Sequence, residues 1–193
     1  FYDYDRGEIL IDGVNIKDYS SKELRNSVGL VLQDPFLYHG TVESNIKMYN
    51  EELTREDVIE ATKFVDAHNF IDKLEDKYDS IVTERGSTFS SGERQLLTFA
   101  RTIASKPKIL ILDEATANID SETEELIQHS LEKMRKGRTT IAIAHRLSTI
   151  QDSNCIYVLD KGEIIESGTH EELIALKGNY YKMYQLQAGM LNK

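Results

Sequence analysis

The chain has 193 residues, of which 40% are hydrophobic and 29% are charged, and its formal net charge is −10. These proportions are typical of a folded globular domain, and a chain of this length buries a sizeable core without disulfides. The acidic balance argues against a nucleic-acid coat or an anionic membrane surface as the main partner. The longest apolar run, residues 155–159, is far shorter than the roughly 20 residues that span a bilayer.

Cysteine usage and the first residues add two expectations. The single cysteine, Cys155, excludes an internal disulfide and is expected to be a small buried hydrophobe in a reducing compartment. Residues 1–5, Phe-Tyr-Asp-Tyr-Asp, contain no initiator methionine and no targeting segment. We therefore expect this sequence to be a piece of a longer chain.

In chain order, the first half of the sequence predicts strands and then a helical block. Residues 7–16 alternate and turn at an Asp-Gly pair, which predicts an antiparallel hairpin. Residues 28–33 form an apolar run that is expected to be a strand, and the proline at residue 35 ends it. From residue 41 to about residue 77 the pattern is helical, and residues 54–57 resemble a capping box.

The second half alternates predicted helices and strands. They are a helix at 90–105, a strand at 108–114, a helix at 121–134, strands at 139–144 and 155–159, a hairpin at 160–163 and helices from residue 170 onward. The alternation predicts an α/β fold: a parallel sheet with helices on both faces, an antiparallel edge and a helical subdomain insertion.

Two adjacent acids, Asp113 and Glu114, stand at the carboxyl end of the strand at 108–114. Side chains at this end of a parallel strand project into the crevice where α/β sheets bind ligands. One acid can hold a hydrated magnesium ion while the next polarises a water for attack on a phosphate. A structural helix cap explains the same two residues equally well.

Three further groups are expected near the same crevice. Residues 89–95 place small side chains at a helix N-terminus, where free N–H groups favour an anion and Ser90 offers a hydroxyl donor. Gln33 ends its own strand, and His145 stands just beyond the strand at 139–144. Each alone has an ordinary explanation: a serine cap, a polar strand end and a surface histidine. Together they would converge on one crevice.

The order of these segments resembles the ATP-binding-cassette (ABC) ATPases over essentially the whole chain. Residues 83–86, Thr-Glu-Arg-Gly, resemble the loop that characterises exporters and contacts their membrane domains. The resemblance implies a P-loop NTPase-like fold and ATP hydrolysis coupled to transport. The matching motifs are the Q-loop at 31–35 (Val-Leu-Gln-Asp-Pro), the signature at 89–95 (Phe-Ser-Ser-Gly-Glu-Arg-Gln), Walker B with the D-loop at 109–120 (Ile-Leu-Ile-Leu-Asp-Glu-Ala-Thr-Ala-Asn-Ile-Asp) and the H-loop at 143–148 (Ile-Ala-His-Arg-Leu-Ser).

The resemblance also implies roles for individual residues. Glu114 would orient or deprotonate the attacking water, and His145 would contact the γ-phosphate. Asp113 and Gln33 would serve the Mg2+ ion that accompanies ATP. Asp120 would bridge the interface between two ATPase domains.

A second ABC ATPase domain is the expected partner, because the family works as a head-to-tail nucleotide sandwich. Ser90, Ser91, Gly92 and Glu93 would bind the ATP that the partner domain holds. Hydrolysis would separate the two surfaces, and the movement would pass to transmembrane domains. The chain is therefore expected at the cytoplasmic face of the plasma (inner) membrane, with no nucleic-acid partner.

The family's phosphate-binding loop, GxxxxGK[ST], does not occur, because none of the 11 glycines is followed by lysine. We interpret this as an N-terminal truncation, and the isolated chain is expected neither to bind MgATP tightly nor to hydrolyse it. Residues 1–193 would then be one ABC-type nucleotide-binding domain without that loop. Within it we expect a sheet portion at 1–33, a helical and signature subdomain at 41–105, and a core sheet with C-terminal helices at 106–193.

The signature also departs from the family's usual Leu-Ser-Gly-Gly-Gln, with Phe89, Ser91 and Glu93 at the first, third and fifth positions. A carboxylate near a triphosphate, and a side chain where the backbone approaches closely, would both weaken that nucleotide site. Alternatively, Glu93 points away and pairs with Arg94. With Glu114 intact, the chain resembles one half of a heterodimeric bacterial multidrug or lipid exporter.

Two other functions stay open. A soluble ABC-type mechanical ATPase acting on nucleic acid is disfavoured by the net charge of −10 and by the exporter-like residues 83–86. A non-catalytic regulatory fragment is supported only by the missing loop. The exported substrate cannot be inferred from these residues, because specificity in such exporters lies in membrane segments.

Overall fold

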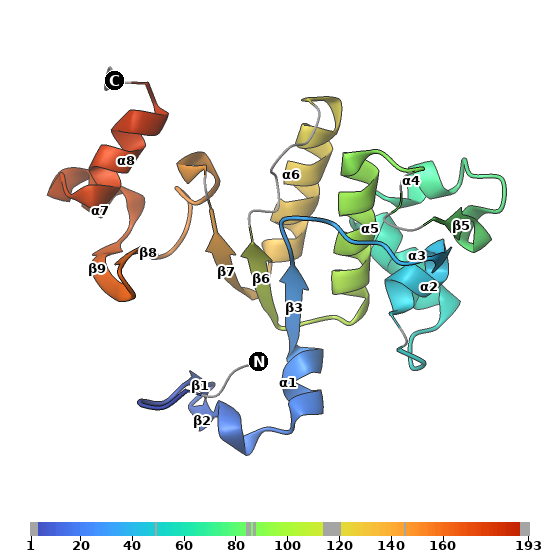
Figure 1. Cartoon of the computed structure of the whole chain (residues 1–193), viewed down its shortest axis with the longest axis horizontal. Helices are drawn as coiled ribbons and strands as arrows, with labels where there is room; N and C mark the ends of the chain where they lie inside the picture. Colours follow the sequence, from blue (N-terminus) through green and yellow to red (C-terminus); the bar gives the residue numbers. More distant parts are fainter. Residues whose placement is uncertain are drawn as a thin grey trace. The chain divides into compact units, whose positions relative to one another are not determined.

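A computed structural model describes residues 4–48, 50–83, 86, 88–113, 121–144 and 146–189 (Figure 1). They fall into two compact units, Phe1–Ile141 and Ala142–Lys193, and each unit is described by itself. The boundary lies within one strand, β7 (Thr139–Ile143). The three-part division that the sequence suggested stays a prediction.

The first unit opens with the predicted hairpin. Strands β1 (Leu10–Ile11) and β2 (Val14–Asn15) pair antiparallel. The turn residues Asp12 and Gly13 have φ angles of 50° and 80°, as the common two-residue hairpin turn requires. The hairpin prediction is confirmed.

A short helix that the sequence analysis did not predict follows the hairpin and a 3-10 turn, η1 (Ile16–Asp18). Helix α1 (Ser21–Ser27) begins after Ser20, whose N–H donates to the Glu23 carboxylate at 2.9 Å while its hydroxyl oxygen accepts from the Glu23 N–H at 3.2 Å. This is a capping box, and the Ser-x-x-Glu spacing was the signal that could have found it.

The sheet of the first unit has the order β3-β6-β7. Strand β3 (Val28–Val31) runs parallel to β6 (Ile109–Asp113), with Val28 opposite Ile109 and Val31 opposite Leu112. The parallel pairing requires a long crossover. Helices and two short strands supply it: β4 (Gly40–Thr41), α2 (Val42–Lys47), α3 (Arg55–Phe64), α4 (His68–Ile71), η2 (Lys77–Asp79), β5 (Ile81–Val82) and α5 (Ser91–Ala104).

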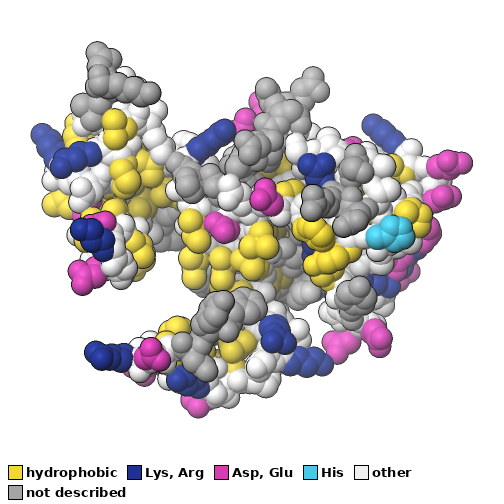
Figure 2. Space-filling model, viewed as in Figure 1, with side chains coloured by type: hydrophobic (Ala, Val, Ile, Leu, Met, Phe, Trp, Pro, Cys, Tyr) yellow, Lys and Arg dark blue, Asp and Glu magenta, His cyan; other side chains and the backbone are white. Residues whose placement is uncertain are grey.

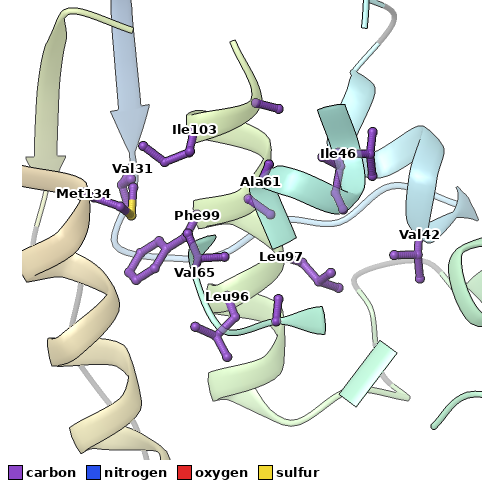
Figure 3. Close-up of a cluster of buried hydrophobic side chains, with 14 of the residues drawn as sticks. Val31, Val42, Ile46, Ala61, Val65, Leu96, Leu97, Phe99, Ile103 and Met134 are labelled. Atoms are coloured by element: carbon purple, nitrogen blue, oxygen red, sulfur yellow. The ribbon is translucent and has the colours of Figure 1, made fainter. Parts of the chain in front are cut away.

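Helix α5 is the centre of the core. In Figure 3, Phe99 and Ile103 of this helix lie near Val31 of β3 and Met134 of α6 (Ser121–Arg135). The helix lies directly on β3: a Cβ atom on Gly29 would be 2.7 Å from a Thr102 methyl group, so only glycine fits this approach. The predicted helix at 90–105 is confirmed.

The opposite face of this sheet carries exposed apolar side chains, including Leu30 and Ile141 at 41% and 54% exposure. Figure 2 shows hydrophobic side chains gathered over β3, β6 and β7. The expected helix cover on both faces is therefore not seen among the described residues of this unit. The α/β class, with a parallel sheet flanked by helices and antiparallel strand pairs, is confirmed.

The second unit contains an antiparallel hairpin and two helices. After η4 (Leu147–Thr149), strands β8 (Ile156–Asp160) and β9 (Glu163–Gly168) pair around Lys161 and Gly162, which have φ angles of 49° and 84°. Helices α7 (His170–Leu176) and α8 (Asn179–Gln187) follow.

Cys155 in the second unit is exposed, so the expectation that it is buried was wrong. Side chains alternate between the two faces of an extended strand. In β8, Ile156 and Val158 point into the core, so Cys155, directly before Ile156, points outward. In either unit, the described helices are too short or too polar to cross a membrane.

Candidate functional site

Two of the predicted site residues lie at the carboxyl edge of the β3–β6 pair. Because Val31 is opposite Leu112, the chain leaves both strands at the same edge. Asp113 is the last residue of β6 and is half-buried, and Gln33 follows β3 with an exposed side chain. The structure therefore brings these two residues to one edge, as the sequence predicted.

Neither of these side chains has a hydrogen bond or ion pair with any other described residue of the chain. A carboxylate and an amide oxygen at one sheet edge suit Mg2+, which takes oxygen ligands and keeps several waters or substrate oxygens around it. Asp113 and Gln33 therefore fit one flank of a magnesium site. No group of three or more His, Cys, Asp or Glu side chains that could hold a metal ion is found within the described ranges.

A second group of predicted site residues forms the N-terminus of α5. The Ser90 hydroxyl oxygen accepts a hydrogen bond from the Glu93 N–H at 3.1 Å, and the Glu93 carboxylate accepts one from the Ser90 N–H at 2.9 Å. This capping box is the structural role that the sequence analysis weighed for Ser90. The alternative pairing of Glu93 with Arg94 is wrong, because Arg94 donates to the carbonyl of Phe89 at 2.6 Å instead.

The capping box leaves part of this helix end available. As the first two helical residues, Ser91 and Gly92 have N–H groups with no carbonyl four residues earlier in the helix. The Ser90 hydroxyl still has its own hydrogen to donate. These donors, at the positive end of the helix dipole, suit a phosphate oxygen.

Close packing explains the glycine of this group. A Cβ atom on Gly92 would lie 2.7 Å from the Thr123 hydroxyl oxygen of α6 and 2.8 Å from its Cβ atom. The buried Gly92 therefore allows the starts of α5 and α6 to meet.

Three predicted site residues, Glu114, Asp120 and His145, lie outside the described residues. Glu84 and Arg85 of the exporter-like segment also lie outside them, whereas Thr83 and Gly86 are described. The roles assigned to all of these residues stay predictions.

The sequence analysis missed Arg101 of α5. Its guanidinium donates to the carbonyls of Asn45 and Phe36 at 2.8 and 2.9 Å, and burial lowers the pKa of this guanidinium from its ordinary value. A charged residue inside the apolar stretch at 96–104 was the available signal, because such a residue needs buried partners.

Comparisons with known proteins agree on one family. A family model described as "ABC transporter" matches residues 1–117. A Streptococcus pneumoniae protein named "Putative ABC transporter ATP-binding protein exp8" is 69% identical over 99% of this chain and 33% of its own length. The "ATP-dependent lipid A-core flippase" of Syntrophus aciditrophicus is 47% identical over 97% of this chain and 31% of its own length.

A solved structure is also similar. It is titled "Structure of a bacterial Atm1-family ABC exporter with ATP bound", is 42% identical and has a TM-score of 0.87. The likeness covers 97% of this chain and 33% of that chain. This chain thus spans about a third of the length of each of these three proteins.

Proposed function

Because this chain belongs to the ABC transporter family, we propose that it is the ATP-hydrolysing part of an exporter. Relatives named as an ATP-binding protein and a lipid A-core flippase, and a structural neighbour titled as an exporter, support this assignment. ATP binding and hydrolysis by this part would drive the movement of transmembrane domains. The complete protein would lie in the plasma (inner) membrane with this chain at the cytoplasmic face.

The observation that carries the proposal is the sheet edge with Asp113 and Gln33. Both offer oxygen atoms that no other described residue occupies. Asp113 would hold Mg2+ and Gln33 would complete its ligand set. When bound, the metal neutralises charge on the phosphates of ATP.

Hydrolysis itself is assigned to two residues that follow strands β6 and β7 in the sequence. Glu114, which follows Asp113, would orient the attacking water and accept its proton. His145, which follows the strand β7 region, would donate a hydrogen bond to the γ-phosphate. Their motif positions support these roles.

The α5 end would serve a different nucleotide. Ser90, Ser91 and Gly92 would donate hydrogen bonds to the ATP held by a second ATPase domain, and Asp120 would contact that domain. Glu93 would keep its capping role and add a negative charge near the triphosphate, which weakens this composite site. We therefore propose a heterodimer in which this chain supplies the intact Glu114 to one site and the weaker signature to the other.

Tight nucleotide binding would need the glycine-rich loop that these 193 residues do not contain. We expect calorimetric titration of the isolated 193-residue chain with MgATP to show no affinity in the micromolar range. A micromolar dissociation constant would contradict this expectation.

The test of the function uses the full-length protein in lipid vesicles, with phosphate release as the measurement. Glu114→Gln should lower turnover by at least about 100-fold and leave ATP binding intact, because it removes the base but not the nucleotide contacts. Ser90→Ala should cost less. Glu163→Gln, at the exposed start of β9, is the matched control and should hydrolyse ATP like the wild type. Equal losses for Glu114→Gln and Ser90→Ala would contradict the asymmetry, and full activity of Glu114→Gln would contradict the function.

A further inference from the structure

The segment between Gln33 and β4 has no helix or strand of its own, so side chains or water must satisfy its backbone. Asn45 of α2, which is 2% exposed, accepts from the Tyr38 N–H at 2.8 Å and donates to the Tyr38 carbonyl at 2.9 Å. It also donates to the Thr41 carbonyl at 3.0 Å. The buried Asn45 amide therefore fixes both the backbone N–H and the backbone carbonyl of Tyr38.

Arg101 of α5 completes this attachment. Its Nε donates to the Asn45 carbonyl at 2.8 Å, Nη1 to the Phe36 carbonyl at 2.9 Å and Nη2 to the Asn45 side-chain oxygen at 3.3 Å. The guanidinium also lies over the Tyr38 ring, 5.8 Å from its centroid. All three nitrogens are thus engaged by the segment that begins at Gln33 and by the helix after it.

Helix α5 is itself fixed to β3, the strand that precedes Gln33. The Thr102 hydroxyl lies 3.2 Å from the Leu30 carbonyl of β3 and 2.9 Å from the Thr98 carbonyl of its own helix, and Leu37 of the following segment is fully buried. The same helix begins after Ser90, about three turns or roughly 16 Å from Arg101. One helix therefore holds both the start of the signature and the segment after Gln33.

We propose that Arg101 is a positioning residue for ATP hydrolysis, which holds the segment after Gln33 on α5 and thereby places the Gln33 amide at the sheet edge beside Asp113. The inference rests on the proposed function. A lysine cannot replace the arginine, because a single ammonium group cannot reach three acceptors in the fixed geometry of a guanidinium.

The kinetic consequence follows from what Gln33 is assigned to do. Arg101→Lys should displace Gln33 without removing a contact to the nucleotide. We therefore expect kcat to fall by about tenfold, KM for ATP to stay within about twofold, and the Mg2+ requirement to rise, measured as weaker Mn2+ binding by electron paramagnetic resonance in the presence of ATP. A purely structural loss would instead lower the amount of active enzyme and leave the Mg2+ requirement unchanged.

The test is a double-mutant cycle in the full-length protein with Arg101→Lys, Gln33→Ala and both changes together. If Arg101 acts through Gln33, Arg101→Lys lowers kcat by less than about twofold in the Gln33→Ala background. An equal tenfold loss in both backgrounds would overturn the inference. If Arg101→Lys does not fold, the cycle is repeated with Asn45→Ser, which removes the hydrogen bonds from the Asn45 amide to the Tyr38 backbone. The same two outcomes then decide the inference.

The matched control is Arg138→Lys, because Arg138 also donates to backbone carbonyls, those of Pro107 and Met134 at 3.0 and 2.8 Å. It should leave kcat and the Mg2+ requirement unchanged. If the wild-type protein hydrolyses ATP and Arg101→Lys lowers kcat equally with and without the Gln33→Ala change, this inference alone is overturned. If the wild-type protein does not hydrolyse ATP, the proposed function is overturned as well.

Discussion

The start of α5 and the carboxyl edge of β3 and β6 carry polar groups in opposite states. At the start of α5, Ser90 and Glu93 satisfy each other through two hydrogen bonds. At the sheet edge, Asp113 and Gln33 have no partner among the described residues. In the first region the side chains stabilise the fold, and in the second they remain available for a ligand.

This difference in hydrogen bonding indicates a structural role for the side chains at the start of α5 and a chemical role for those at the sheet edge. Buried or half-buried polar groups are usually satisfied within the protein, so an unpartnered half-buried carboxylate indicates a ligand more strongly than a capped serine does. We therefore expect substitutions at the sheet edge to affect catalysis, and substitutions at the start of α5 to affect folding and nucleotide binding together.

Asp113→Asn should have the largest effect. Loss of the carboxylate removes the negative charge that holds Mg2+, so kcat of the full-length protein should fall by at least about 100-fold, measured as phosphate release. Asp160→Asn is the matched control, since Asp160 also ends a strand, β8, but lies in the second unit. A loss of less than about fivefold in Asp113→Asn would remove the distinction between the two regions.

Gly92→Ala should have the next largest effect, because the new methyl group meets Thr123 at the start of α6. We expect the free energy of unfolding to fall by about 1–3 kcal/mol, measured by denaturant titration. Gly29→Ala, which meets Thr102 and Pro107 equally closely, should cost a similar amount. ATP turnover of the folded protein should fall only for Gly92→Ala, and equal turnover losses would show that close packing alone is responsible.

Ser90→Ala should lower stability by about 1 kcal/mol, because a helix loses its cap. Ser20→Ala removes the same residue type from the capping box of α1 and should cost about as much in thermal or chemical denaturation. Only Ser90→Ala should also reduce ATP turnover. If the two variants behave alike in both measurements, the start of α5 has a structural role alone.

Glu93→Gln should have the smallest effect on folding, since an amide oxygen can still accept the hydrogen bond from the Ser90 N–H. Stability should change by less than about 0.5 kcal/mol. Removal of a negative charge near the triphosphate should strengthen nucleotide binding by the assembled full-length protein a few-fold, measured by equilibrium titration. Unchanged affinity would show that the Glu93 charge is too far from the nucleotide to matter.

The sequence predicted the parts of the fold that depend on local patterns. The apolar strand that ends in Asp113 and the helix that begins after Ser90 were both predicted, because periodicity and capping residues lie close together in the chain. Helix α1 was missed because it has no buried residue and so no apolar period, although its capping box was visible.

The role of Arg101 could not be predicted from local patterns. Its acceptors on Asn45 and Phe36 are 56 and 65 residues away in the sequence, and only the folded chain brings them to one guanidinium. Glu114, Asp120 and His145, which the motifs place at the centre of the chemistry, lie outside the described residues. For them the motif remains the only support.

Metal binding tests the distinction between the two regions most directly. The measurement uses the full-length protein with the Glu114→Gln change in the presence of ATP. Mn2+ replaces Mg2+, and electron paramagnetic resonance gives the amount of bound Mn2+. We predict that adding Asp113→Asn weakens Mn2+ binding at least about tenfold, because the metal loses a charged ligand, whereas adding Ser90→Ala leaves it within about twofold. Equal Mn2+ affinity in the Asp113→Asn protein and its parent would contradict the assignment of the metal site to the sheet edge.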